Sequence, residues 1–240
     1  MAYQQLNQTE VSIEDDFCYK NNVHNAPVEA RLQFLKKVYA ILSAQVLMTT
    51  LVCGAVMSSP TLTATVKANA DFMPMLGIMS FMVLIWLHVQ RRNYPTNFYL
   101  LGIFTLLQSL TIATVTTFYD SVIVIKAAVI TGTVFLSLTM YTFNSKKDYS
   151  SWGAALFCGL WILIVSNLVH VLFFPNSPIY EELSAAGGAG LFCLFIIYDT
   201  HLVMKKLSPE EYILAAINLY LDILNLFLEI LRIMGESHRR

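Results

Sequence analysis

Seven apolar segments, each about 20 residues long and nearly free of charge, take up most of this 240-residue chain. A helix of about 20 residues spans the roughly 30 Å hydrocarbon core of a bilayer, so each segment has the length of a membrane-spanning helix. The chain is therefore predicted to be an all-α integral membrane protein, folded as a seven-helix bundle. The segments run at about 36–58, 72–90, 97–118, 121–143, 152–174, 183–204 and 210–234.

The composition supports the same fold class. Hydrophobic residues make up 56% of the chain and charged residues 13%, against roughly 25% charged residues in a soluble domain. The net charge is −1 and no long block of like charge occurs, so the expected partner is the lipid bilayer and not nucleic acid. We expect a polar N-terminal tail at 1–30, a membrane domain at 31–236 and a short basic tail at 237–240.

Lysine and arginine residues in the short breaks indicate the orientation, because cytoplasmic loops retain them. Basic pairs follow the second, fourth and sixth segments, and basic residues flank the start of the first. The N-terminus is therefore predicted to be cytoplasmic. Arg232, Arg239 and Arg240 conflict with a seventh crossing. Segment 210–234 either crosses despite this basic end or turns back within the membrane, surrounded by protein or water.

The last segment carries a stripe of polar residues. Four of them, spaced four, three and four residues apart, lie on one side of a helix. A helix that is apolar elsewhere must turn such a stripe toward protein or water, so the last helix is predicted to be central in the bundle. The four residues are Asn218, Asp222, Asn225 and Glu229.

A second carboxyl group, Asp199, follows a mostly apolar run in the sixth segment. One Asp at the centre of a membrane helix costs roughly 2.5–3.5 kcal/mol, which favours an ion or proton site. If Asp199 and Asp222 meet, they share a proton and titrate as a unit, and the shared proton clips the two helices together. Full ionisation repels them or admits a cation that prefers oxygen ligands, such as Ca²⁺. The alternative is a neutral aspartate that only locks two helices together.

The geometry of that pairing is demanding. A simple hairpin with its turn near 207–208 leaves Asp199 about six residues, or roughly 9 Å, out of level with Asp222. The pairing therefore requires stagger or tilt between the last two helices. His201 lies two residues after Asp199 and is expected to face elsewhere, at the membrane interface.

Two short motifs predict local structure near these residues. In "SPEE" at 208–211, Ser208 is the predicted N-cap, Pro209 the first helical residue and Glu211 the partner that reaches back to the cap. The last helix is therefore expected to begin at 209. The small residues of "AAGGAG" at 185–190 predict a close approach of neighbouring helix backbones.

Several blocks together are characteristic of one family. The stretch "FIIYDTHLVMKKLSPEEYILAAINLYLDILNLF" resembles the signature of the transmembrane Bax inhibitor motif family. "SIEDDF", "LKKVYAILSAQVL", "NYPTNFYLL" and "YTFNSKKDYS" resemble its Golgi anti-apoptotic protein branch, so the resemblance covers nearly the whole chain. It implies a seven-helix bundle whose last helix is surrounded by the others. It also implies a pH-sensitive calcium leak in Golgi and endoplasmic reticulum membranes, which lowers stored calcium and inhibits apoptosis.

The resemblance also assigns roles to residues. It implies that Asp199 and Asp222 form the proton-sensitive latch, and that Glu210, just before the last helix, takes part in ion conduction. Asn218, Asn225 and Glu229 are candidate pore-lining residues. The expected protein is not an enzyme and has no catalytic residue or cofactor. Calcium is the permeating ion, with no metal site beyond a transient one at the aspartate pair.

Other functions remain open alternatives at the level of sequence. The first is a non-conducting adaptor that regulates calcium channels or death-pathway proteins, with "SIEDDF" as its binding surface. Self-association into a homo-oligomer is compatible with either function. An intramembrane aspartyl protease also uses two aspartates, but the Gly-x-Gly-Asp of that class is "LYLD" here.

Overall fold

The structure is a computed structural model that describes residues 28–173, 177–208 and 210–239. Most of the predicted N-terminal tail and Pro209 lie outside these residues. Helices make up nearly all of the described chain, with two short 3₁₀ turns, η2 and η3. The elements are α2 (Val28–Ser58), α3 (Pro60–Ala68), η2 (Ala70–Phe72), α4 (Met73–Gln90), α5 (Thr96–Thr116), α6 (Ser121–Asn144), η3 (Ser150–Trp152), α7 (Gly153–Phe173), α8 (Pro178–Lys205) and α9 (Tyr212–Arg239).

Seven of the described helical segments are long and apolar enough to cross a membrane, which confirms the predicted fold class. Six match the expected windows to within a few residues, and α2 begins well before its window because its first turns are polar. The short helix α3 was not predicted. It is capped by Ser59, whose hydroxyl accepts a hydrogen bond from the backbone N–H of Leu62, and Pro60 occupies its first turn.

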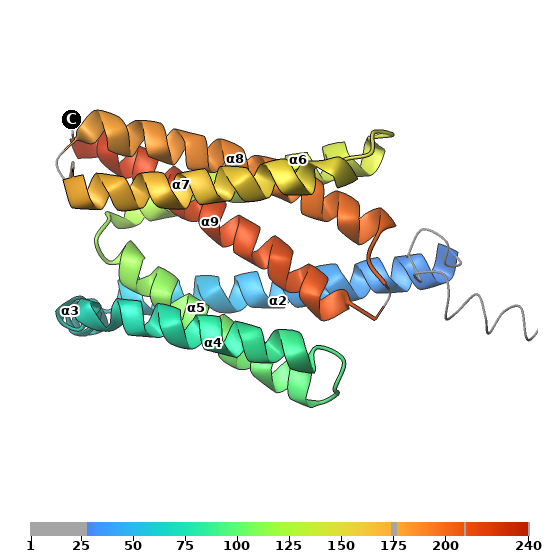
Figure 1. Ribbon diagram of the computed structural model, residues 1–240. Coiled ribbons are helices and arrows are strands. Elements are labelled where there is room, and N and C mark those ends of the chain that lie inside the picture. Colours follow the sequence, from blue (N-terminus) through green and yellow to red (C-terminus); the bar gives the residue numbers. More distant parts are fainter. Residues whose placement is uncertain (1–27, 174–176, 209, 240) are drawn as a thin grey trace, which may run out of the picture.

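Helix α9 lies at the centre of the bundle. Figure 1 shows α2, α4 and α5 on one side, α6, α7 and α8 on the other, and α9 running obliquely between them. In α9, 61% of the most apolar window is buried, against 11–44% in the other six spans. It packs against α2, α5, α6 and α8. The predicted central position of the last helix is therefore confirmed.

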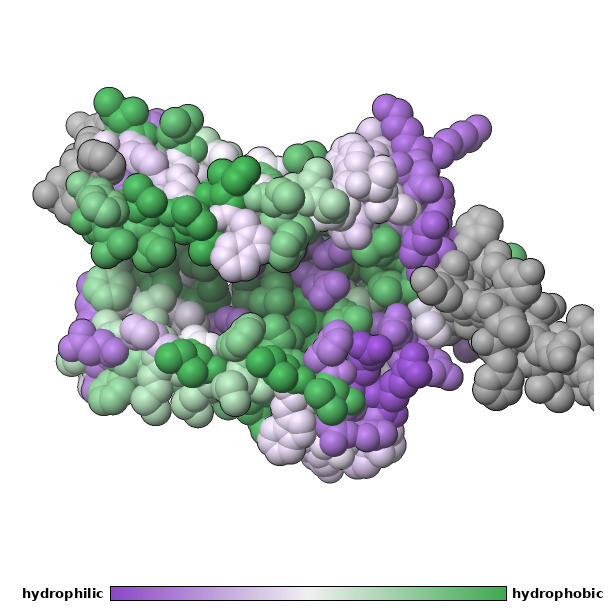
Figure 2. All heavy atoms as spheres, in the orientation of Figure 1, coloured by the Kyte–Doolittle hydropathy of each residue, from purple (hydrophilic) through white to green (hydrophobic). Residues whose placement is uncertain are grey.

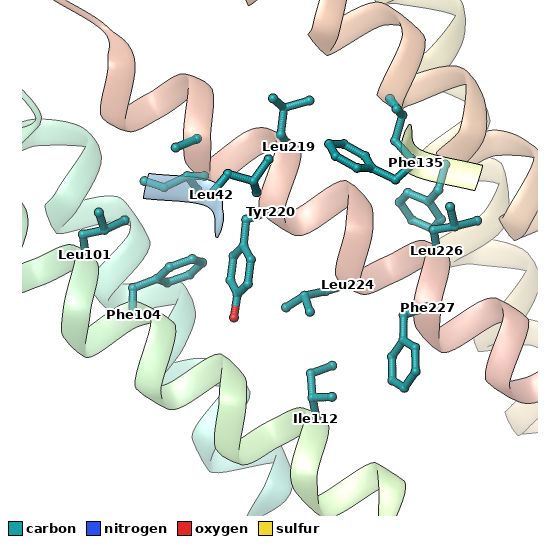
Figure 3. Close-up of a cluster of buried hydrophobic side chains, with 14 of the residues drawn as sticks. Leu42, Leu101, Phe104, Ile112, Phe135, Leu219, Tyr220, Leu224, Leu226 and Phe227 are labelled. Carbon is teal, nitrogen blue, oxygen red and sulfur yellow. The ribbon is translucent and has the colours of Figure 1, made fainter. Parts of the chain in front are cut away.

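The core forms around the apolar side chains of α9. Leu219, Tyr220 and Leu226 are almost completely buried there, and Figure 3 shows Leu101 and Phe104 of α5 on one side and Phe135 of α6 on the other. By contrast, α4 and α7 are only 11% buried, and most of their large apolar side chains are exposed. Such surfaces suit the hydrocarbon core of a bilayer.

Charged residues gather at the ends of the bundle. Figure 2 shows hydrophilic residues concentrated at the end that carries the α4–α5 and α6–α7 connections, whereas the start of α2 and the end of α9 lie at opposite ends (Figure 1). Helix α9 is one unbroken helix of 28 residues, about 42 Å long. Segment 210–234 therefore does not fold back on itself within the described chain, and it is long enough to cross.

The start of α9 differs from the prediction. The helix begins at Tyr212 and not at 209, and the backbone N–H of Glu211 bonds the carbonyl of Ser208 in a turn before it. The Glu211 carboxylate lies 3.4 Å from Arg91 and 3.8 Å from Arg92, on the α4–α5 connection. Because these arginines engage the carboxylate, it is not available to close a capping box.

We expect packing around α9 to contribute much of the stability, since lipid chains are as apolar as leucine and helices in a membrane associate largely through close packing. Leu219→Ala should lower the free energy of unfolding by about 2–4 kcal/mol through the cavity it leaves. Leu51→Ala, at a residue that is 63% exposed, is the matched control and should cost under about 0.5 kcal/mol. Reversible unfolding in mixed micelles, followed by circular dichroism, measures both. Equal losses would contradict the central role of α9.

Candidate functional site

Two carboxyl groups meet in the interior where α8 packs on α9. Asp199 of α8 is 8% exposed and Asp222 of α9 is 6% exposed. Their side chains lie close enough to interact, and the Oδ2 atom of Asp222 has no hydrogen-bond partner among the described residues. Because an ionised carboxylate can only accept hydrogen bonds, the two groups can bond each other only when the pair holds at least one proton.

The structure therefore brings Asp199 and Asp222 together, although a simple hairpin would leave them at different heights along the helix axes. Asp199 lies six residues before the end of α8 at Lys205, and Asp222 lies ten residues after the start of α9 at Tyr212. These separations are about 9 Å and 15 Å along the two helix axes. The inclination of α9 across α8 in Figure 1 accommodates the difference.

The remaining stripe residues of α9 have different surroundings. Asn218 and Asn225 are half-buried, and the Asn225 amide donates a hydrogen bond to the Leu221 carbonyl of its own helix. Glu229 is 8% exposed and pairs with Arg232 at 2.9 Å. The stripe thus carries a second buried carboxyl group, about 10 Å from Asp222 along α9.

A glycine of α8 makes room for that second carboxyl group. A Cβ atom added at Gly188 would lie 2.8 Å from the Glu229 carboxyl carbon, closer than van der Waals contact allows. The small-residue motif at 185–190 was predicted to let helix backbones approach. At Gly188 the absence of a side chain leaves room for the Glu229 side chain of α9.

Glu210 lies apart from the aspartate pair. It sits in the turn before α9, its side chain is 72% exposed, and a carboxyl oxygen lies 3.9 Å from Arg92. With the contacts of Glu211 to Arg91 and Arg92, this makes a charged cluster that joins the α8–α9 turn to the α4–α5 connection. The exposed pair of Arg92 and Glu210 contributes about 0–1 kcal/mol, so this contact can open readily.

His201, which the sequence predicts at the membrane interface, is buried against the α6–α7 connection. It is 2% exposed, and its Nε2 atom lies 2.9 Å from Asp148 in the α6–α7 connection, while the Tyr149 ring packs edge-on against it. Hydrogen bonds from the Ser150 hydroxyl and backbone N–H, and then from His201, hold the pKa of the Asp148 carboxyl below its usual range. Asp148 is thus an ionised acceptor at neutral pH. The two partners are 53 residues apart, and no local sequence pattern links them.

A separate hydrogen-bond network holds α9 to the other half of the bundle. The Thr49 hydroxyl of α2 bonds the Tyr220 hydroxyl of α9 at 2.7 Å and Ser109 of α5 at 3.0 Å. One turn away, the Gln45 amide donates to Thr105 at 3.1 Å. The bond to Tyr220 holds the face of α9 opposite the carboxyl pair, and the other two bonds join α2 to α5.

No group of three or more His, Cys, Asp or Glu side chains is arranged to hold a metal ion within the described residues. A cation that reached the pair would therefore meet two aspartate carboxyls as its charged ligands. Since Ca²⁺ takes six to eight oxygen ligands, water would have to supply most of the rest.

These features define an integral membrane protein with a seven-helix bundle and a buried pair of aspartates beside its central helix. Residues 31–239 match the protein family described as inhibitor of apoptosis-promoting Bax1. The match covers most of the chain, and the chain therefore belongs to the Bax1 inhibitor family.

Close relatives are found in animals, viruses and fungi. The chain is 46% identical to protein lifeguard 4 of Mus musculus, over 95% of each chain. It is also 46% identical to the Golgi anti-apoptotic protein of vaccinia virus (strain Lister), over 95% of this chain and 96% of the relative. Bax inhibitor 1 of Schizosaccharomyces pombe is 37% identical, over 98% of this chain and 88% of the relative.

Gly188 provides a direct test of the Glu229 pocket. Gly188→Ala should lower stability by about 1–3 kcal/mol, because the new methyl group displaces the Glu229 carboxyl from its buried position. In a Glu229→Ala background the same substitution should cost much less, since the clash is gone. Gly187→Ala, where an added Cβ meets nothing within 4 Å, is the matched control. Melting temperatures in one detergent measure all four variants. An equal cost of Gly188→Ala in both backgrounds would show that Glu229 does not occupy this pocket.

Proposed function

We propose that the protein is a pH-sensitive calcium or cation leak in which Asp199 and Asp222 form the latch. The observation that carries this proposal is the contact between two buried carboxyl groups on the α8–α9 interface. A hydrogen-bonded pair of carboxyl groups holds a proton at least part of the time. The protonation state of the pair therefore responds to pH, and the pair lies where α8 and α9 meet.

The shared proton keeps α8 clipped to α9. When it leaves, two negative charges face each other, and at about 4 Å in an effective dielectric of about 20 they repel by about 4 kcal/mol. That energy is comparable to the coupling energies that shift conformational equilibria. The repulsion either separates the helices or is relieved by a cation with a preference for oxygen ligands, such as Ca²⁺.

The stripe on α9 supplies the rest of the proposed pathway. Asn218 and Asn225 lie on either side of Asp222, one turn away, and Glu229 lies two turns away, so polar groups recur along one face. Glu210 offers a negative charge outside the bundle at the same end as Arg91 and Arg92, where it would draw cations toward the stripe. The exposed pair of Arg92 and Glu210 there can break without a large loss of stability.

The cellular role that we propose follows from the relatives. Lifeguard 4 and the viral Golgi anti-apoptotic protein resemble this chain over almost their full length, which supports an anti-apoptotic, non-enzymatic membrane protein of the Golgi, with the endoplasmic reticulum as a second location. Basic residues after α4, α6 and α8 support a cytoplasmic N-terminus. A leak in these membranes would lower stored calcium and so reduce sensitivity to apoptosis.

Calcium flux through the purified full chain in liposomes, measured from about pH 5 to pH 8, tests the latch. The flux should rise with pH in the wild type, because loss of the shared proton opens the pair. Asp222→Asn should give a low and pH-independent flux, since an asparagine can still bond Asp199 but cannot ionise. Asp71→Asn, at an exposed aspartate of η2, is the matched control and should follow the wild type.

The outcomes separate the candidate functions. A wild-type pH profile in Asp222→Asn would rule out the latch while leaving a leak. No flux at any pH in protein that remains folded would favour the non-conducting adaptor that regulates calcium channels or death-pathway proteins. Cleavage of a membrane peptide would favour the protease.

A further inference from the structure

A cavity of about 270 Å³ lies between α2, α5, α6 and α9, with no contribution from α8. It is therefore separate from the contact between Asp199 and Asp222. Figure 3 shows part of its wall, where Ile112 of α5 faces Leu224 and Phe227 of α9 across a common space. The cavity lies on the side of α9 away from the carboxyl pair.

The cavity opens sideways, between α2 and α6. The lining residues Thr50 and Gly54 of α2 and Ile125 and Ala128 of α6 are exposed at its edge. All four lie within membrane-spanning helices. Helix α2 packs on α5 and α9, and α6 packs on α8 and α9, so α9 forms the floor between the two edges. The opening therefore faces the interior of the bilayer, and membrane lipids are the molecules that reach it.

The lining offers hydrocarbon contacts and no charged group. Its hydroxyl groups already have partners: Thr50, Thr116 and Thr131 donate to backbone carbonyls of their own helices, and Thr49 bonds Tyr220 and Ser109. A polar ligand or an ion would lose its hydration there and find no free hydroxyl donor in exchange. An aliphatic chain has no hydration or hydrogen bonds to lose, so the apolar lining favours a lipid chain.

A positive charge lies on the outward face of α6, about 100° round the helix from Ile125 at the edge of the opening, near the end of α6 that begins the span. Lys126 is exposed on the membrane-facing surface, next to the lining residue Ile125 and five residues after the helix begins at Ser121. A lysine in this position extends its ammonium group along the helix toward the headgroup region. Its charge complements the phosphate of a lipid whose chain enters the opening.

We propose that this cavity is a binding site for one membrane phospholipid, with an acyl chain between α2 and α6 and its phosphate beside Lys126. The chain of the lipid lies against Leu224 and Phe227 of the central helix. The site does not depend on ion conduction, because its wall shares no residue with the proposed ion pathway.

Photo-crosslinking tests the site on the full chain in nanodiscs that contain a phospholipid with a diazirine in one acyl chain. Mass spectrometry of the labelled peptides should place the crosslinks on the facing edges of α2 and α6, above the level on the exposed surfaces of α4 and α7. Gly54→Leu and Gly132→Leu fill the opening, and an added Cβ at either position meets nothing within 4 Å. Excluding even two methylene groups weakens binding by about tenfold, so labelling should fall by about that factor.

Gly77→Leu is the matched control, since it adds the same side chain to an exposed glycine of α4 that also has open space. It should leave the labelling of α2 and α6 unchanged. Lys126→Gln should reduce labelling by the phospholipid and leave labelling by a photoactivatable sterol unchanged. Uniform labelling of all lipid-facing helices, or unchanged labelling in both glycine variants with wild-type melting temperatures, would overturn the site. Stronger labelling by the sterol, insensitive to Lys126→Gln, would overturn the phospholipid as its occupant.

Discussion

A carboxyl group in hydrocarbon is tolerated only if the fold provides it with a partner, and this requirement organises the whole bundle. Asp222 lies in the middle of α9, and its partner Asp199 lies on α8. Both are almost completely buried, so neither is turned toward lipid. The helix that carries Asp222 must therefore be surrounded by other helices. The peripheral helices α4 and α7 contribute no acidic residue to this interior.

Helix α9 is held by different interactions on its different faces. The face toward α8 carries two carboxyl groups. Asp222 interacts with Asp199, and Glu229 fills the space left by the absent side chain of Gly188. The face toward α2 and α5 carries the Tyr220 hydroxyl, bonded to Thr49. Neutral hydroxyl bonds persist over the physiological pH range. Under the proposed function, the pair of Asp199 and Asp222 would therefore change its protonation while α9 stays attached to α2 and α5.

Much of this arrangement was predictable from periodic patterns. The seven apolar windows required only the length of a membrane-spanning helix, and the spacing of Asn218, Asp222 and Glu229 placed the polar face on α9. The start of α9 was missed because Glu211 is engaged by Arg91, a residue 120 positions away. The contact of His201 was missed for the same reason, since its partner Asp148 lies in the α6–α7 connection. Interactions between distant residues leave no local signal.

The sequence by itself determined that this chain has seven segments with the length of a membrane-spanning helix, that its last helix is central and that two aspartates lie in apolar surroundings. Those conclusions follow from hydrophobicity and helical period, which are properties of single segments. Only the tertiary structure decided whether Asp199 and Asp222 meet. Their contact depends on the inclination of α9 across α8 (Figure 1), and that inclination results from the simultaneous packing of α9 against α2, α5, α6 and α8. A crossing angle between helices is set by side chains from every neighbour and is not encoded in one segment.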